Sequence, residues 1–298
     1  MNERGHIPVL LNEVIEHLDC AREGIYIDGT IGLAGHAVEI LKRNPGASLV
    51  GVDIDELALA RVQETLKPYS DRVRLYQADF RYIPNLDLDF SRVRGLLLDL
   101  GLSSFQLDSP ERGFSFNQEG PLDMRMDLRN KTTAFKIVDT YSEPRLARLF
   151  QEYGELRQAK RLAREIVARR KLRKFETTVD LRLVIEQVCH WIPQKGKVHP
   201  AAKVFQALRI EVNQELQGLA EFLETMAGLV PAGARFVVIS FHSLEDRIVK
   251  QTLARLSGSN GRPAMMRLLT KKPIGPSAEE IALNSRSRPA KLRAAEKV

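Results

Sequence analysis

Acidic residues end four short apolar runs of the chain, and each run is followed by a turn. The four runs are Ile25–Asp28, Leu49–Asp53, Val73–Asp79 and Gly95–Asp99. Runs of this length and composition are typical of buried strands. In a parallel α/β sheet, ligands bind at the edge where the strands have their carboxyl ends. The four carboxylates are therefore candidates for one shared ligand site.

A glycine-rich turn follows the first run, where Gly29, Gly32 and Gly35 have the spacing G-x-x-G-x-x-G and open a helical pattern. Glycines let the backbone approach a ligand closely, and the start of a helix has free N–H donors. The spacing is not the G-x-G-x-x-G of dinucleotide binders, and a plain strand-to-helix turn would also explain it. Asp53 ends the second run 18 residues after Gly35, where a carboxylate can accept hydrogen bonds from both ribose hydroxyls.

The third and fourth runs separate the two cofactors that such a site can hold. Ala78-Asp79-Phe80 places a polar group and an aromatic edge where adenine would lie, and Asp99 is followed by a loop of its own. A nicotinamide-dependent oxidoreductase needs no such pair. The order of these features along four strands favours an S-adenosylmethionine-dependent methyltransferase.

Helical periodicity between the runs predicts a βαβαβ order with right-handed crossovers and a parallel sheet. The next strand of this type, Arg235–Ser240, comes more than 130 residues after Asp99, and the intervening stretch has helical spacing. We expect an α/β fold, a class I (Rossmann-like) methyltransferase sheet with an inserted helical domain. The predicted cofactor-binding domain comprises residues 1–110 and 211–298, and the predicted substrate-recognition insert residues 111–210. After Leu256, the Gly, Ser and Pro content predicts irregular structure.

Basic residues are concentrated in two segments of a chain whose formal net charge is +7. Between positions 157 and 174, nine Lys and Arg residues accompany one Glu, and between positions 257 and 298 nine accompany three Glu. Clustered cations suit a phosphate backbone, whose binding is driven by counterion release. A solvated helix face and a loose tail are the alternative, but two clusters in one chain favour a polyanionic partner such as RNA.

Composition excludes several classes of protein. The chain has only two cysteines, Cys20 and Cys189, without a CxxC motif or a Cys/His cluster, so neither a disulfide framework nor a zinc site is indicated. Methyl transfer requires no metal, and no ligand cluster suggests one. No run approaches the roughly 20 apolar residues that cross a bilayer, so we expect a cytoplasmic protein without membrane partners.

Several long motifs resemble the signature of the RsmH (formerly MraW) family over nearly the whole chain. They lie in both halves of the expected sheet and in the insert: His6–Leu11, Asp99–Asp108, Glu111–Phe116, Gly120–Asp127, His199–Ala201, Phe205–Ile210, Val212–Leu216, Ser240–Arg247 and Asn284–Arg293.

The resemblance implies transfer of a methyl group from S-adenosyl-L-methionine to N4 of a decoding-region cytidine in 16S rRNA of the small ribosomal subunit. It implies cofactor contacts at Ala34, Gly35, His36, Asp53, Phe80, Asp99 and Gln106. This chain has Ala34 and Ala37 where the family pattern usually shows Gly and Ser, and a positive φ at position 34 would weaken cofactor binding. The sequence leaves the oligomeric state open, with a homodimer as one option.

An exocyclic amine is a poor nucleophile because its lone pair is delocalised into the ring, so the enzyme must align it and accept its hydrogen bonds. Asp99 is the candidate acceptor. His242 follows the fifth strand and is a candidate for accepting the released proton, with a structural histidine as the alternative. His199 is a weaker candidate, and Phe114, Phe116 and Trp191 could stack on an unstacked base or simply fill a core. A non-catalytic ribosome-binding protein with the same fold is the remaining alternative.

Overall fold

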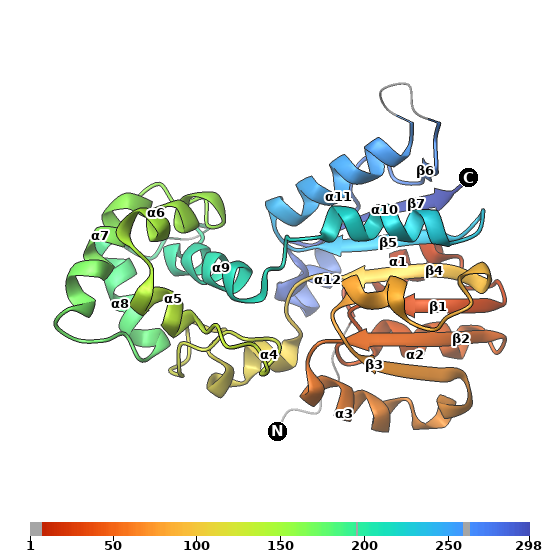
Figure 1. Ribbon diagram of the computed structural model, residues 1–298, viewed down its shortest axis with the longest axis horizontal. Coiled ribbons are helices and arrows are strands. Elements are labelled where there is room, and N and C mark those ends of the chain that lie inside the picture. The colour runs from red at the N-terminus through yellow and green to blue at the C-terminus, as the bar shows by residue number, and fades with distance from the viewer. Residues whose placement is uncertain (1–7, 195, 259–262) are drawn as a thin grey trace. The chain divides into compact units, whose positions relative to one another are not determined.

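The computed structural model describes residues 8–194, 196–258 and 263–298 (Figure 1). These residues form two compact units, which divide at 101/102 and 215/216. The boundaries expected from the sequence are 110/111 and 210/211. No helix among the described residues is long and apolar enough to cross a membrane.

The first unit is built on a seven-stranded sheet with the order β3-β2-β1-β4-β5-β7-β6 (Figure 1). Its strands are β1 (Gly24–Asp28), β2 (Ala47–Asp53), β3 (Val73–Gln77), β4 (Val93–Asp99), β5 (Arg235–Ser240), β6 (Met266–Leu268) and β7 (Lys291–Lys297). Strands β1 to β5 are mutually parallel, and β7 is antiparallel to both β5 and β6. The parallel α/β sheet predicted from the apolar runs is confirmed, and the strands that end at Asp28, Asp53 and Asp99 meet at one carboxyl edge.

Helices cover both faces of this sheet. They are α1 (Leu11–Leu18), α2 (Gly35–Arg43), α3 (Glu56–Thr65), α10 (Leu219–Leu229) and α11 (Ser243–Leu256). The short α12 (Ala278–Leu283) lies in the connection from β6 to β7. One core joins apolar side chains of α1 and α2 to Tyr26 and Leu97 of the sheet. The other joins α10 and α11 to the opposite face, through Ile27 and Val238. The central strands β1, β2, β4 and β5 are thus buried on both sides, as the continuous apolar runs indicate.

The C-terminal segment contradicts the prediction of irregular structure after Leu256. Strand β7 pairs along all of β5, from Lys291 opposite Ser240 to Glu296 opposite Arg235. Its centre is buried although it carries Arg293, whose Nε donates to Asp246 Oδ1 at 2.6 Å. The prediction was wrong because small and paired charged residues fill this strand, so the sequence has no apolar run there.

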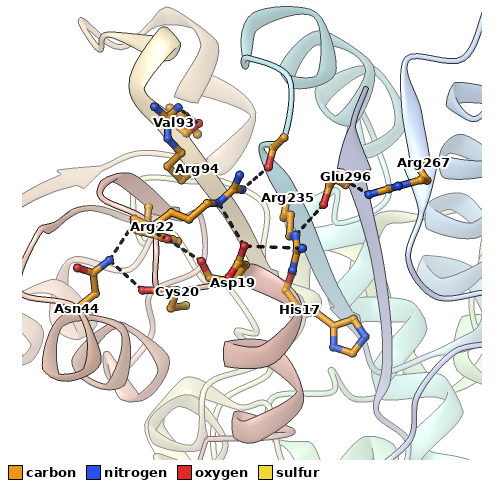
Figure 2. Close-up of polar contacts among 12 residues, drawn as sticks. His17, Asp19, Cys20, Arg22, Asn44, Val93, Arg94, Arg235, Arg267 and Glu296 are labelled. Atoms are coloured by element: carbon orange, nitrogen blue, oxygen red, sulfur yellow. Dashed lines mark hydrogen bonds and ion pairs between the residues drawn. The ribbon is translucent and has the colours of Figure 1, made fainter.

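Ion pairs join the elements at the amino edge of the sheet (Figure 2). Asp19 lies between Arg22 and Arg235, at 3.3 and 3.8 Å. Arg235 also contacts Glu296 at 2.9 Å, and Glu296 holds Arg267 at 2.7 Å. The edge opposite the acidic strand ends is therefore occupied by structural contacts.

The second unit is helical, as predicted for the insert. Its helices are α4 (Ser104–Asp108), α5 (Ala134–Thr140), α6 (Glu143–Glu152), α7 (Ala159–Arg170), α8 (Thr178–Cys189) and α9 (Pro200–Asn213). Apolar residues at helical spacing form one core, with Phe150, Leu162 and Leu181 fully or almost fully buried. The amphipathic pattern of the sequence therefore reflects packing among these helices.

Candidate functional site

Three carboxylates end neighbouring parallel strands of the first unit. Asp28 ends β1, Asp53 ends β2 and Asp99 ends β4. Burial raises the pKa of Asp28 to about 7, and the charge of Asp53 acts in the same direction. Burial likewise raises the pKa of Asp53 to about 6. Burial, together with the charges of Asp28 and Glu245, holds the pKa of Asp99 well above its usual range. The carboxyl edge therefore favours a cationic ligand.

The Asp99 carboxyl group keeps acceptor capacity. Its backbone N–H donates to Thr30 Oγ1 at 2.6 Å, which fixes the end of β4. Oδ2 lies 3.8 Å from Nδ1 of His36. Oδ1 is buried, and no described residue donates a hydrogen bond to it. A buried acceptor without a donor costs free energy, so this oxygen can accept a hydrogen bond from a ligand.

The glycine-rich turn brings residues 34 to 36 to the same edge. Gly35 opens α2, and a Cβ at this position would lie 2.4 Å from Pro8 Cγ, so only glycine fits. His36 is buried, and its Nε2 donates to the Val9 carbonyl at 3.0 Å. Ala34 caps α2 with φ 64° and ψ 20°. Position 34 thus has the positive φ that favours glycine, at a cost of about 1 kcal/mol for alanine; its effect on cofactor affinity stays a prediction.

Asp53 shapes the turn as well as the end of β2. Its Oδ2 accepts from the Gly32 N–H at 2.8 Å, and its Oδ1 accepts from the Asp55 N–H at 2.9 Å. Each carboxylate oxygen has a further lone pair. Asp53 can therefore accept hydrogen bonds from two ribose hydroxyls while it holds the turn in place.

The two residues after β3, Asp79 and Phe80, differ in their capacity to bind adenine. Asp79 is already engaged, because its two oxygens accept from Arg81 Nε and a terminal guanidinium nitrogen at 2.6 and 2.5 Å. Phe80 is half-buried and packs edge-on against Phe222 of α10, with ring centroids 5.0 Å apart. A Cβ on Gly29 would lie 3.2 Å from Phe80 Cβ. Phe80 therefore lies beside the turn that follows β1, and its contact with adenine stays a prediction.

His242 caps α11. Its Nδ1 accepts from the Glu245 N–H at 3.3 Å, so the neutral ring carries its proton on Nε2, which lies 3.1 Å from Glu245 Oε1. The Nδ1 lone pair is used by the cap, which favours a structural histidine over a proton acceptor. Sequence reasoning missed Glu245, a carboxylate 2% exposed. The signal was present, because His242-x-x-Glu245 before an apolar run has the form of a capping box.

The remaining predicted residues belong to the second unit. Gln106 is buried in α4, and its Oε1 accepts from the Ser103 N–H at 3.2 Å in a capping box. His199 caps α9 and stacks on Phe116 with ring centroids 5.0 Å apart. Trp191 meets His199 edge-on at 4.9 Å. His199 is thus held by its own unit, and the roles of these residues toward a ligand stay predictions.

Asp28→Asn should stabilise the protein at alkaline pH. The side chain is 2% exposed and accepts from the Thr30 N–H, a hydrogen bond that asparagine retains. A carboxyl group whose pKa is raised from 3.8 to about 7 on folding costs stability once the pH exceeds both values and costs none below them. We expect the free energy of unfolding to rise by about 1–3 kcal/mol at pH 8. This gain in the free energy of unfolding should vanish near pH 4. Urea unfolding of the wild type and the variant at pH 4 and pH 8 measures it. A gain that is independent of pH would contradict the prediction.

Comparison with known proteins agrees with this geometry. The chain matches the model of the MraW methylase family over residues 3–298. Three proteins named ribosomal RNA small subunit methyltransferase H are similar along their lengths. That of Carboxydothermus hydrogenoformans is 46% identical over 99% of both chains. That of Thermotoga neapolitana is 48% identical over 98% of this chain and 96% of its own, and that of Trichodesmium erythraeum is 44% identical over 99% of both. This chain belongs to the MraW methylase family of S-adenosylmethionine-dependent methyltransferases.

Proposed function

We propose that this chain methylates N4 of a decoding-region cytidine in 16S rRNA of the small ribosomal subunit. The names of its relatives, which match end to end, support ribosomal RNA of the small subunit as the substrate. The observation that carries the choice of an exocyclic amine is Asp99, whose buried Oδ1 has no donor among the described residues. An amine that must be held by hydrogen-bond acceptors fits such a group.

The residues at the carboxyl edge fit the methyl donor. Asp53 would hold its ribose, Phe80 would contact its adenine, and the turn at Ala34, Gly35 and His36 would approach the amino acid portion; Gln106 is a further candidate contact from the second unit. When bound, S-adenosylmethionine supplies an electrophilic methyl group on a positively charged sulfur. The three strand-end carboxyl groups, whose pKa values are raised, would stabilise such a cation.

Asp99 would act at two points of the reaction. As a carboxylate, its Oδ1 accepts a hydrogen bond from N4–H, which favours a geometry nearer sp3 and localises the nitrogen lone pair. After N4 has gained the methyl group it carries one proton too many. Asp99, with a pKa well above the usual range, can take that proton. His242 was the second predicted acceptor; its capping role makes it a positioning residue in this proposal.

We also propose that the helical unit recognises the RNA. Its exposed cations Arg157, Lys160 and Lys171 have no ion pair with any residue that the structure describes. Unstacked bases are bound by cations and aromatic rings, and Phe116 and Trp191 are partly exposed. Methylation of small-subunit particles from a strain that lacks the enzyme tests the proposal, because a protein that only binds the ribosome would leave them unmodified.

Replacing both cysteines should leave turnover unchanged. Methylation at carbon 5 of a pyrimidine needs a nucleophile, normally a cysteine thiolate, to add to carbon 6. Burial raises the pKa of Cys20 to about 12, and this residue precedes β1 at the amino edge. Cys189 ends α8 of the helical unit, and burial raises its pKa too. Neither thiol is activated, whereas transfer to N4 needs no covalent adduct.

The measurement is the rate of Cys20→Ala/Cys189→Ala on small-subunit particles, followed by nuclease digestion and mass spectrometry of the nucleosides. We expect N4-methylcytidine at the wild-type rate. Formation of 5-methylcytidine, or a double variant that folds but is inactive, would overturn the assignment of an amino-methyltransferase.

A further inference from the structure

We infer that the segment between β6 and β7 is a contact surface for the phosphate backbone of the substrate RNA, through Lys271, Lys272 and Arg288. These three residues are called the edge cations below. The inference rests on the proposed function, because it needs an RNA substrate. It assigns to these side chains a task that the chemistry at Asp99 does not include.

The ion pairs of the C-terminal segment separate structural cations from free ones. Arg267 is held by Glu296 at 2.7 Å, as Figure 2 shows. Lys291 and Arg293 both contact Asp246, at 3.3 and 2.6 Å. The edge cations are all exposed, and none has an ion pair within the part of the chain that the structure describes. Arg262 belongs to the same predicted cluster but lies outside the described residues.

The backbone on both sides of Lys271 and Lys272 is held in place by hydrogen bonds to β7. Thr270 and Ala294 exchange hydrogen bonds, with Thr270 N–H donating at 3.2 Å and Thr270 Oγ1 accepting at 2.9 Å. Ile274 and Leu292 bond in both directions, at 3.0 and 2.8 Å. Lys271 and Lys272 lie between these two anchors. A backbone that is already ordered loses less conformational entropy on binding, so the cations are presented to a ligand at low cost.

Arg288 has a comparable support. It follows Ser287, which is fully buried and whose Oγ donates to the Asn284 carbonyl at 2.8 Å. Two residues later Ala290 is buried too, and its N–H donates to the Ser287 carbonyl at 2.8 Å. The backbone on both sides of the exposed guanidinium is therefore fixed.

The edge cations lie on the side of the sheet where the carboxylates gather. Strand β7 begins at Lys291, opposite Ser240, the last residue of β5. The connection from β6 to β7 therefore runs at the carboxyl edge. Within it, Glu280 of α12 accepts from the Leu10 N–H at 2.8 Å, and the neighbouring Val9 carbonyl accepts from His36. A continuous set of contacts thus joins this segment to the turn beside Asp99.

Helix α7 and the residues that flank it, the other basic segment of the sequence, also use part of their charge in internal pairs. The cations of α7 and those that follow it contact Glu143, Glu165, Asp180 and Asp139, at 3.6, 2.6, 3.6 and 3.5 Å. Arg170 instead donates to the Val138 carbonyl at 2.6 Å. The net charge counted from the sequence therefore overstates what this segment offers to phosphates. Its exposed cations Arg157, Lys160 and Lys171, which have no ion pair with a described residue, match the edge cations in number.

The phosphates that flank a target nucleotide also need positive charge near the methyl-transfer site, since an RNA strand carries one negative charge per nucleotide. The three strand-end carboxyl groups cannot supply it, because they are acids whose raised pKa values suit a cationic ligand instead. Cations at the rim of the same edge would attract the phosphates and guide the strand toward the site. The two kinds of group thus have separate tasks.

The test compares Lys271→Gln/Lys272→Gln/Arg288→Gln with a matched control, Lys67→Gln/Arg74→Gln/Arg92→Gln. The control removes the same charge from three exposed cations at or near the amino edge, for which the described residues offer no ion pair. Binding to unmethylated small-subunit particles is measured at several salt concentrations. We expect the edge variant to lower the salt slope by about 2, at roughly 0.7–0.9 per phosphate contact, and kcat/KM for particles by about 10- to 100-fold. Affinity for S-adenosylmethionine should remain unchanged.

A charge-retaining variant, Lys271→Arg/Lys272→Arg/Arg288→Lys, should keep the wild-type slope, which separates charge from folding effects. Equal slopes for the edge variant and its control, with an active wild type, would overturn this inference alone. A wild-type protein that neither binds nor methylates the particles would overturn the proposed function, and this inference with it.

Discussion

Asp99→Asn should lower kcat for methylation of small-subunit particles by about 10²- to 10⁴-fold, the usual contribution of a positioned acid or base. The variant retains a carbonyl oxygen that can accept a hydrogen bond from the target amine. It lacks the negative charge and cannot take a proton. The loss should therefore appear in kcat more than in the KM for particles.

The same substitution should make the protein more stable at pH 8. Asp99 is a partly buried carboxyl group with a fully buried Oδ1, and desolvation holds its pKa well above its usual range. By linkage, such a group costs stability above its folded pKa and none below its unfolded pKa. Asp99→Asn should thus raise the melting temperature at pH 8 and leave it unchanged near pH 4. If Asp99 were merely structural, its replacement would lower both the stability of the protein and its activity. A variant with a lower kcat and a higher melting temperature therefore identifies a catalytic role for Asp99.

Asp89→Asn is a suitable control, because Asp89 is an exposed carboxylate that caps its own turn through the Ser91 N–H. It should change neither rate nor stability appreciably. An Asp99→Asn protein that is folded and retains more than about a tenth of the wild-type kcat would show that another group assists the amine.

The sheet could be predicted because buried parallel strands leave a local signal. The predicted Arg235–Ser240 coincides with β5, and Leu49–Asp53 lies within β2, which begins two residues earlier. Each of these strands is covered on both faces, so the sequence must supply uninterrupted apolar residues. The clustering of strand-end carboxylates follows from parallel order alone, which is why candidate residues such as Asp53 and Asp99 could be named.

Features that depend on tertiary pairs could not be predicted in this way. Strand β7 has no apolar run, and its Arg293 is tolerated only because Asp246 of α11 is 2.6 Å away. Arg81 turns Asp79 from a ligand candidate into half of an ion pair. The positive φ of Ala34 depends on the turn around it. Each is a contact between side chains, or a backbone conformation, that sequence spacing does not encode.

Asp53→Ala should weaken the binding of S-adenosylhomocysteine by about 1–3 kcal/mol, roughly 5- to 150-fold, because the ribose hydroxyls lose their acceptor. S-adenosylhomocysteine is the appropriate ligand, since it has the same ribose but no charge on sulfur, which reduces the influence of Asp28 and Asp99. The variant also loses the acceptor of the Gly32 and Asp55 N–H groups. Asp53→Asn, which keeps one oxygen and the shape of the side chain, should therefore lose less.

The pH dependence of the affinity for S-adenosylhomocysteine tests the role of Asp53 independently of how large the loss of affinity in Asp53→Ala is. In the free protein, burial raises the pKa of Asp53 to about 6. Hydrogen bonds from ribose hydroxyls stabilise the carboxylate, so the pKa falls when the ligand binds and a proton is released. Affinity should thus be constant above about pH 6 and decrease up to tenfold for each pH unit below it.

In Asp53→Asn this group no longer titrates, and calorimetry between pH 5 and 8 should give a flatter profile. A wild-type affinity that rises on acidification, or an identical profile in the variant, would place the ribose elsewhere at the edge of the sheet.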